Sequence, residues 1–320
     1  MRITAQAQPN IALIKYWGKS DVDRNLPSTG SLSITLDSLY TRMTVELTDA
    51  GQDSLQVNGV ADDAMLPRLS TCIDRMLGSH RPAAEIVSDC NFPIAAGLAS
   101  SASAFAALVV AVDGAGGLQL DQQKLARYAG QASGSAARSL FGGFAELSAG
   151  DDQIEVAEIK SKDAWPLEVI VAVTEESAKP MSSSAGMQLS AATSPFYAGW
   201  VDQQPADLDV ARAAVETQDF AALGQIAEHN CLKMHSVMWA SRPPLVYWNS
   251  ATLACMETVR RLQQDGVPVF FTIDAGPQVK AVCEPSASDQ VEAALTNTNG
   301  VIRILRSGLG SGAKILDDSC

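Results

Sequence analysis

The sequence has little of what metal sites and disulfide frameworks require. Its 320 residues include three histidines and six scattered cysteines. The cysteines form no C-x-x-C pair and have no neighbouring histidine at metal-ligand spacing. His229 and His235 are six residues apart, a spacing that does not place both on one helical face. We therefore expect no protein-ligated zinc or iron, and free thiols of the kind that a reducing cytosol maintains.

Basic residues and long apolar segments are also scarce. Lysine and arginine total 23 against 36 aspartates and glutamates, a net charge of −13 that argues against a nucleic-acid partner. An anionic small molecule still fits if a few cations converge locally. The N-terminus "MRITAQAQPN" has no apolar signal-peptide core, and the longest apolar helix candidate, 102–112, is too short to cross a bilayer. These features predict a soluble, cytoplasmic protein with no membrane partner.

What remains is the composition of an ordinary globular protein, with 47% hydrophobic and 18% charged residues. Alternating patterns predict strands, and helical spacing predicts helices. The expected strands are 10–14, 41–47, 84–89, 142–147, 167–173, 267–277 and 301–307, and the expected helices are 65–77, 101–112, 206–238 in more than one piece, 250–266 and 288–296. Helix 101–112 is expected to end at Gly114. The pattern changes near residue 175, so we predict two α+β domains, 1–175 and 176–320.

In the stretch "QPNIALIKYWGKSD" (8–21), two lysines and two aromatic residues directly follow a segment predicted to be a buried strand. An ordinary strand end with an amphipathic rim is one interpretation. The wall of a pocket for an anionic small molecule is the other, because ammonium groups and ring faces would then meet the ligand.

Two small-residue segments are candidates for anion binding. "FPIAAGLASSASAFAAL" (92–108) leads from Gly97 into a helix N-terminus, where free backbone N–H groups favour phosphate. It lacks the Gly-Lys-Ser/Thr ending of a Walker motif, and a capped core helix is the alternative. "GQASGSAARSLFGGF" (130–144) carries the single charge Arg138, suited either to a carboxylate or phosphate or to a structural ion pair.

"FFTIDAGP" places Asp274 at the end of an apolar run. The carboxylate either forms a turn before Ala-Gly-Pro or acts as an acid or base in the cleft between the domains. Taken together, local cations, a phosphate loop and one isolated carboxylate are typical of phosphoryl transfer from a nucleotide to a hydroxyl of an anionic substrate.

These segments resemble those of the diphosphomevalonate decarboxylase family, a branch of the GHMP small-molecule kinase superfamily. The similarity covers essentially the whole chain, and Ala99 in "GLASSAS" stands where generic GHMP kinases carry glycine. The matching segments, in the family's order, are "NIALIKYWGK", "LPSTGSLSITL", "PIAAGLASSASAFAAL", "SGSAARSLFGGF", "SSSAGM" with "TSPFY", and "TIDAGP". The resemblance implies a two-domain GHMP kinase fold with a ribosomal S5 domain 2-like N-terminal domain and a ferredoxin-like C-terminal domain.

The resemblance also implies a reaction. The family decarboxylates (R)-5-diphosphomevalonate to isopentenyl diphosphate, CO2, ADP and phosphate, a step of the mevalonate pathway of isoprenoid biosynthesis. ATP and Mg2+ are the implied cofactors and a homodimer is the implied assembly, but the sequence does not indicate protein ligands of Mg2+.

Site residues carry over by position. Asp274 matches the aspartate near the tertiary hydroxyl of the substrate, Lys15 a lysine that balances charge, and Arg138 the arginine that holds the substrate carboxylate. Other positions match substrate-binding residues, namely Tyr16, Trp17, Gly18, Lys19, Arg68, Gly134, Ser135, Ala136, Ala137, Ser139, Ser183 and Ser184. The ATP phosphate loop is matched by Pro93, Gly97, Leu98, Ala99, Ser100, Ser101 and Ala102.

Small departures from the family pattern concern the fine geometry of substrate binding, not the reaction class. Gln278 stands where asparagine is common in the family, and Ser184 where some bacterial relatives carry arginine. The nearest rivals are a mevalonate 3-kinase and a decarboxylase of the monophosphate. Asp274 and Lys15 together favour decarboxylation over simple kinase action. A non-catalytic ligand sensor on the same scaffold is a third hypothesis, disfavoured because Asp274 and the serine loop are retained.

Overall fold

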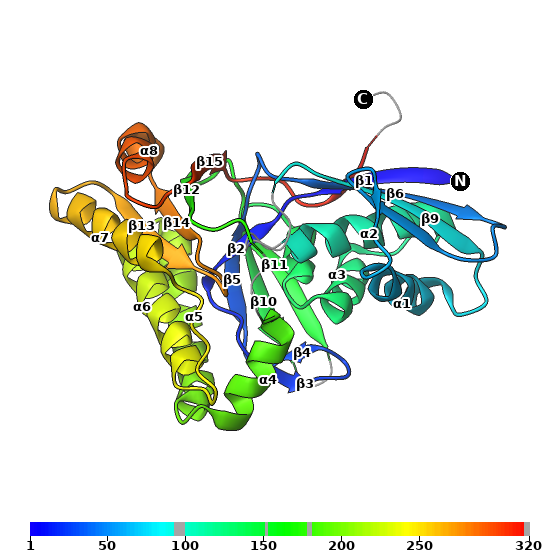
Figure 1. Cartoon of the computed structure of the whole chain (residues 1–320), viewed down its shortest axis with the longest axis horizontal. Helices are drawn as coiled ribbons and strands as arrows, with labels where there is room; N and C mark the ends of the chain where they lie inside the picture. The colour runs from blue at the N-terminus through cyan, green and yellow to red at the C-terminus, as the bar shows by residue number, and fades with distance from the viewer. Residues whose placement is uncertain (93–99, 151–152, 178–180, 317–320) are drawn as a thin grey trace.

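The computed structural model describes residues 1–92, 100–150, 153–177 and 181–316. In Figure 1 the first half of the chain lies to the right and the second half to the left. The first half contains β1 (Arg2–Ala7), β2 (Asn10–Ile14), β3 (Lys19–Asp21), β4 (Leu26–Pro27), β5 (Ser31–Thr35), β6 (Thr41–Thr48), β7 (Ser54–Val57), β8 (Val60–Ala61), α1 (Leu66–Leu77), β9 (Ala83–Cys90), α2 (Ser100–Gly116), α3 (Gln122–Ala132), the 3-10 helix η1 (Ala136–Leu140), β10 (Phe144–Ala149) and β11 (Ile154–Lys160). The second half contains β12 (Glu168–Val173), α4 (Ser183–Thr193), α5 (Tyr197–Thr217), α6 (Phe220–Trp239), α7 (Ser250–Gln264), β13 (Val269–Ile273), β14 (Val279–Cys283), the 3-10 helix η2 (Pro285–Ala287), α8 (Ser288–Thr296), β15 (Arg303–Gly308) and β16 (Lys314–Ile315).

Three main sheets organise these elements. The first is six-stranded, in the order β16-β1-β6-β9-β7-β8, and helices α1 to α3 lie beneath it in Figure 1. A four-stranded sheet, β11-β10-β5-β2, lies in the middle of the molecule. The second half builds its own sheet, β13-β14-β12-β15, against which α6, α7 and α8 pack. The mixture of helices and strands expected from the sequence is confirmed.

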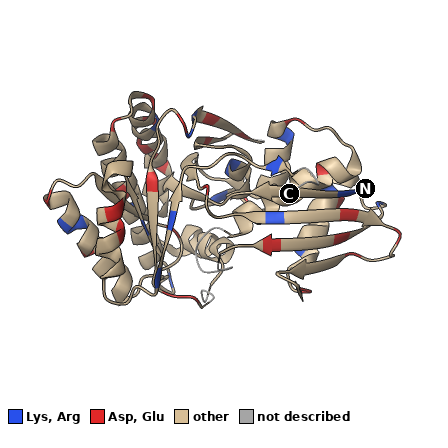
Figure 2. Ribbon diagram, turned by 90° about the horizontal axis from the view of Figure 1, so that it is seen from above, with Lys and Arg blue, Asp and Glu red and all other residues tan. Residues whose placement is uncertain are grey.

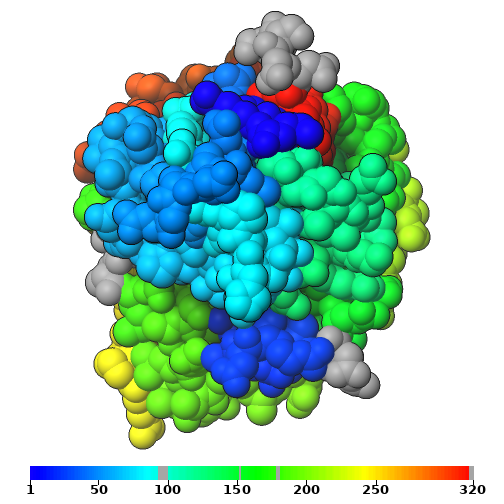
Figure 3. Space-filling view, turned by 90° about the vertical axis from the view of Figure 1, so that its right-hand side faces the viewer, coloured from blue at the N-terminus to red at the C-terminus, as the bar shows by residue number. Residues whose placement is uncertain are grey.

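The last strand, β16, pairs with the first strand, β1, so the two ends of the chain lie in one sheet. β16 pairs antiparallel with β1, and Ala5 lies opposite Ile315. In Figure 3 the segment near the N-terminus (dark blue) accordingly lies beside the red segment near the C-terminus. Neither β1 nor β16 is among the strands that the sequence patterns predicted.

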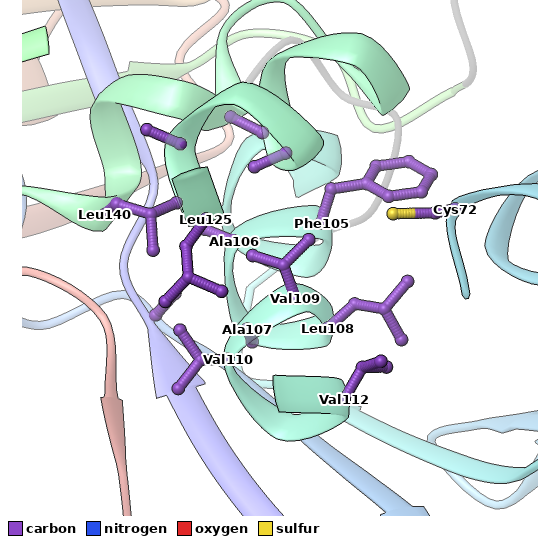
Figure 4. Close-up of a cluster of buried hydrophobic side chains, with 14 of the residues drawn as sticks. Cys72, Phe105, Ala106, Ala107, Leu108, Val109, Val110, Val112, Leu125 and Leu140 are labelled. Atoms are coloured by element: carbon purple, nitrogen blue, oxygen red, sulfur yellow. The ribbon is translucent and has the colours of Figure 1, made fainter. Parts of the chain in front are cut away.

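Helix α2 is the centre of the N-terminal core. Its residues Phe105 to Val112 are buried on every side between the six-stranded sheet and helices α1 and α3, as Figure 4 shows. The prediction that this helix ends at Gly114 is wrong, because it continues to Gly116 and the chain turns at Gly117, where φ is +64°. Gly114 instead permits close packing, since a Cβ there would come within 3.2 Å of both Ile3 and Ile315.

Helix α5 begins at Tyr197, nine residues before the helical segment expected at 206. Pro205 lies inside it, and a proline normally suggests a helix start because it lacks the N–H donor. Two tertiary hydrogen bonds hold the turns that precede the proline. Trp200 Nε1 donates to the Trp17 carbonyl at 2.8 Å, and Gln204 Nε2 donates to the Lys15 carbonyl at 2.7 Å.

Strand β12 lies in the sheet of the second half. It pairs antiparallel with β14 on one side and with β15 on the other. The prediction assigned residues 168–173 to the first domain, whereas their hydrogen bonds join them to the second sheet.

Candidate active site

A cavity of about 830 Å³ lies between elements of both halves, a size usual for sites that bind small molecules. Most of the site residues expected from the sequence lie in its wall. They are Lys15, Tyr16, Trp17, Lys19, Arg68, Ser100, Ser101, Gly134, Ser135, Arg138, Ser183, Ser184 and Asp274. Segments separated by more than 250 residues in the sequence therefore face one space.

Other expected residues lie outside this wall. Ala136 and Ala137 are buried in the N-terminal core, and the Ser139 hydroxyl accepts a hydrogen bond from Asn10 Nδ2 at 2.8 Å. Gly18 has φ +135° and packs so tightly that a Cβ would collide with the Tyr197 hydroxyl. Ala102 is fully buried in α2. The expected phosphate-loop residues Pro93, Gly97, Leu98 and Ala99 lie outside the described residues.

The segment after β2 is held as part of the cavity wall. The backbone N–H of Lys15 donates to Asn230 Oδ1 of α6 at 2.8 Å, and its carbonyl accepts from Gln204 of α5. Asn230 is itself buried and bonded to Asp207 at 2.7 Å. Two helices thus satisfy the backbone polar groups where the strand ends, and the side chains turn into the cavity.

Asp274 lies between two buried ammonium groups. Lys15 Nζ lies 2.6 Å from its Oδ1 and Lys280 Nζ lies 3.1 Å from its Oδ2. Each lysine side chain is 1% exposed, whereas that of Asp274 is 25% exposed. Lys15 also donates to the Ala12 carbonyl at 2.8 Å. The carboxylate is therefore fixed from behind and open toward the cavity.

The charges of this cluster follow from its geometry. Burial alone would raise the pKa of the Asp274 carboxyl, but the Lys15 and Lys280 ammonium groups outweigh burial and hold that pKa well below its usual range. Burial lowers the pKa of Lys280, and the Asp274 carboxylate partly offsets this effect. Asp274 is thus a carboxylate at neutral pH, bound at both oxygens.

Arg138 is a buried cation whose hydrogen bonds all go to neutral groups. Its guanidinium donates to Ser31 Oγ at 2.5 Å, to Ser33 Oγ at 3.0 Å and to Asn10 Oδ1 at 3.2 Å. Among the described residues no carboxylate forms an ion pair with it, so the structural ion pair considered above is not seen there. Burial lowers the pKa of Arg138 to about 10, so it stays protonated at neutral pH. A buried cation at a cavity wall, without an anion of its own, favours an anionic ligand.

A second group of cations lies elsewhere on the wall. Lys19 Nζ donates to Ser184 Oγ at 2.5 Å, and its pKa is lowered by burial and by the positive charge of Arg68. The hydroxyl of Tyr16 is buried and has no hydrogen-bond partner among the described residues, and burial raises its pKa to about 12. The Tyr16 ring lies so close to Gly134 that a Cβ there would clash with it. Lys19 and Arg68 repel each other, and the Tyr16 hydroxyl has no partner among the described residues. Together they favour the binding of a polyanion.

The first turn of α2 opens on the same cavity. Ser101 Oγ lies 3.2 Å from Ser133 Oγ, and both serines are cavity residues. A helix N-terminus with small hydroxyl side chains favours phosphate. No group of three or more His, Cys, Asp or Glu suited to a metal ion occurs within the part of the chain that is described.

Several residues of the site escaped sequence reasoning. Ser31 and Ser33 lie on one face of β5, and the alternation in "GSLSITL" was the available signal. Lys280 also had a signal, because a lysine in the apolar run "VKAVC" is unusual for a buried strand. Asn230 and Gln204 had none, since polar residues on amphipathic helices are usually solvated.

Comparison with known proteins agrees with this geometry. A curated diphosphomevalonate decarboxylase from Ganoderma lucidum is 37% identical over 305 residues, which cover 86% of this chain and 76% of that protein. The chain belongs to the diphosphomevalonate decarboxylase family. The family model described as "Diphosphomevalonate decarboxylase-like N-terminal domain" matches residues 7–158. That described as "Mevalonate 5-diphosphate decarboxylase C-terminal domain" matches residues 169–304.

Solved structures of the diphosphomevalonate decarboxylase family superpose closely. A mevalonate diphosphate decarboxylase from Staphylococcus aureus gives a TM-score of 0.92 at 37% identity, over 99% of this chain and 98% of that one. A structure described as MDDEF in complex with MVAPP, AMPPCP and magnesium gives a TM-score of 0.91 at 34% identity, over 99% of both chains. The two-domain GHMP kinase fold expected from the sequence is confirmed.

Proposed function

We propose that this chain catalyses the ATP-dependent decarboxylation of (R)-5-diphosphomevalonate to isopentenyl diphosphate, a carboxy-lyase reaction of the mevalonate pathway. The observation that carries the proposal is the cavity whose wall contains both Asp274, bound by Lys15, and Arg138, which forms no ion pair among the described residues. The substrate needs a group facing its tertiary 3-hydroxyl and a cation for its C1 carboxylate. It also needs a polycationic region for its diphosphate.

Each residue takes the role that its surroundings support. Asp274, open to the cavity, orients the 3-hydroxyl, and its charge favours positive charge that develops at C3 when phosphate leaves. Arg138 holds the C1 carboxylate in the plane required for loss of CO2. Tyr16, Lys19 and Arg68 bind the diphosphate, because they supply an unpaired hydroxyl and two cations.

The cavity fits ATP and Mg2+. ATP supplies the phosphoryl group that turns the 3-hydroxyl into a leaving group, and Mg2+ neutralises its phosphates. Ser100 and Ser101, in the first turn of α2, would bind those phosphates. Since the described residues offer no cluster of metal-ligating side chains, Mg2+ would be held mainly by phosphate oxygens and serine hydroxyls. AMPPCP and magnesium accompany MVAPP in a structurally similar protein, which supports this assignment.

One experiment separates the proposal from its rivals. The protein is incubated with ATP, Mg2+ and, separately, mevalonate, its 5-phosphate and its 5-diphosphate, and ADP and CO2 are measured on the same sample. The proposal predicts equal amounts of ADP and CO2 from the diphosphate. ADP without CO2 would identify a 3-kinase, and preference for the 5-phosphate would identify the monophosphate decarboxylase. Binding without either product would identify a sensor.

We also propose a cytoplasmic homodimer of two domains, predicted from the sequence as 1–175 and 176–320, although the pairing of β12 favours a division in the segment 161–167. The free thiols of the described cysteines support the compartment, and the sheet pairing of β12 supports the boundary. No helix among the described residues is long and apolar enough to cross a membrane. Light scattering of the purified chain tests the dimer, and limited proteolysis tests the boundary, because cleavage should concentrate in the exposed segment between the domains.

A further inference from the structure

Asp274 has two cationic neighbours, and only Lys15 is expected from the family motifs. Lys280 is the second residue of β14 and lies between apolar residues of a fully buried strand. Its backbone pairs with Thr272 of β13 and with Val171 of β12, and its side chain reaches Asp274 Oδ2 at 3.1 Å. Lys280 thus contacts the carboxylate from the side opposite the bond to Lys15.

The fold itself does not require this lysine. A buried ammonium group is costly unless it is paired, and the carboxylate that Lys280 pairs with already has Lys15 as a partner. Among the described residues, this cluster holds two ammonium groups and one carboxylate, an excess of one positive charge. An apolar side chain of similar length at position 280 would leave a balanced Lys15–Asp274 pair. Lys280 therefore lowers the free energy of unfolding relative to an apolar residue at this position. A role in function, not in folding, would account for its presence.

We propose that Lys280 is a positioning residue of the decarboxylation site, which holds Oδ2 of Asp274 and so fixes the orientation in which the carboxylate faces the 3-hydroxyl of the substrate. The inference rests on the function proposed above. A single bond from Lys15 leaves the carboxylate free to rotate, whereas bonds to both oxygens set the directions of the remaining lone pairs. Those lone pairs face the cavity, where the side chain is 25% exposed. Such preorganisation matters because small errors in the position of a reacting group can cost about 100-fold in rate.

The neighbouring ionisable groups do not obscure a test by pH. Helix α6 contributes Cys231 and His235, the segment after β2 contributes Lys15, and η1 contributes Arg138. Burial raises the pKa of the Cys231 thiol and lowers that of His235 to about 3. Arg138 remains protonated as well, so between pH 5 and 7 these three groups keep one charge state. The pKa of Asp274 lies well below this range in the parent, so a loss of kcat between pH 7 and 5 that occurs only in a Lys280 variant would report on Asp274.

The experiment compares Lys280→Met and Lys280→Gln with the parent, using the diphosphate substrate, ATP and Mg2+. We expect kcat to fall about 10- to 100-fold in both variants, with the KM for ATP within about twofold of the parent value. The acid limb of the kcat profile should move to higher pH, because Asp274 retains only one ammonium partner. The melting temperature should stay the same or rise.

Arg306→Met is the matched control. Arg306 lies on β15 of the same sheet and pairs with Glu168 and Asp289, away from Asp274. Its loss should leave kcat and the pH profile unchanged. A folded Lys280 variant with parental kcat and acid limb would overturn the proposal, as would a large fall in melting temperature or failure of both variants to fold. Inactivity of the parent itself would instead refute the proposed function.

Discussion

Asp274 shows how the surroundings of a single residue decide between two interpretations of its sequence. An aspartate before Ala-Gly-Pro is usually a turn former. Here both carboxylate oxygens are taken by buried lysines, and its side chain faces the cavity. A turn former requires neither feature.

The first prediction concerns Asp274→Asn, which keeps the shape of the side chain and removes its charge. Turnover should fall by roughly 10²–10⁴, the usual range for a residue that orients or accepts the proton of a reacting hydroxyl. Stability should also fall, because two buried ammonium groups lose their shared counterion. ADP formation, CO2 release, nucleotide affinity and a melting curve are measured on one preparation.

Asp53→Asn is the matched control for that variant. Asp53 forms a similar ion pair with Arg81 at 2.6 Å and is 13% exposed, but it is not among the cavity residues. It should lose stability and keep turnover. Parental turnover in a folded Asp274→Asn protein would reduce Asp274 to a turn former.

The second prediction concerns Arg138→Lys. The guanidinium is held in one plane by Ser31, Ser33 and Asn10, so two of its N–H groups have fixed directions. An ammonium keeps the charge but not the planar two-point contact, so kcat should remain about 100-fold or more below the parent value. CO2 release is the measurement. Near-parental release by this variant would show that charge alone is sufficient.

At the scale of elements, the first turn of α2 gives the third prediction. Ser101 lies inside that turn, and its hydroxyl contacts Ser133 across the cavity wall. Ser101→Ala should lower turnover by about 10²–10³, the cost of one well-placed donor to a developing charge, with little change in melting temperature. Ser190→Ala is the control, because the Ser190 and Ser241 hydroxyls form a similar buried pair at 2.9 Å and neither residue lies in the cavity wall. The control variant should have a lower melting temperature and parental turnover. Parental turnover with a lower melting temperature in Ser101→Ala would mean that Ser101 has only a structural role.

Sequence reasoning located elements best where the local pattern alone decides them. Strand β6 and helix α1 alternate or repeat clearly, and their predicted bounds differ from the observed ones by one residue. Helix α5 and strand β16 were harder, because tertiary contacts decide them. Gln204 and Trp200 hold the early turns of α5, and β16 is two residues long and exists through its pairing with β1.

The same division applies to the site. Motifs located Asp274, Lys15 and Arg138, because those residues stand out within short runs. The side chains that hold them, such as Asn230 and Ser33, come from other elements, and only the folded chain places them there. Local sequence therefore predicted these residues of the cavity wall better than it predicted the side chains that hold them.

At the scale of the whole molecule, charge is distributed unevenly. The chain carries a net charge of −13, and acidic side chains are spread over both halves in Figure 2. The cavity wall reverses this balance, with cations at Lys15, Lys19, Arg68, Arg75 and Arg138 against carboxylates at Asp23, Asp62 and Asp274. The local convergence of cations that an anionic substrate requires is therefore present in an acidic protein.

The last prediction concerns the pH dependence of global stability. His235 is buried beneath the site, where Trp248 Nε1 donates to its Nε2 at 3.2 Å, and its Nδ1 has no hydrogen-bond partner among the described residues. Burial lowers its pKa to about 3, from an ordinary value near 6.5. Between these values the unfolded chain binds a proton that the folded chain does not, so stability falls as pH drops below 6.5. The slope should approach about 1.4 kcal/mol per pH unit below pH 6, a loss of about 2 kcal/mol in total between pH 7.5 and 5.

Urea unfolding at pH 5, 5.75, 6.5 and 7.5 measures this slope, in a range where few carboxylates titrate. His235→Gln should remove about one bound proton from the difference between the unfolded and folded states, and so flatten the slope by the amount given above. His80→Gln is the control, because His80 is exposed and its replacement should leave the slope unchanged. An equal slope in the parent and in His235→Gln would mean that the folded protein accommodates a charged His235. The interior behind Asp274 would then tolerate a further positive charge beside Lys15 and Lys280.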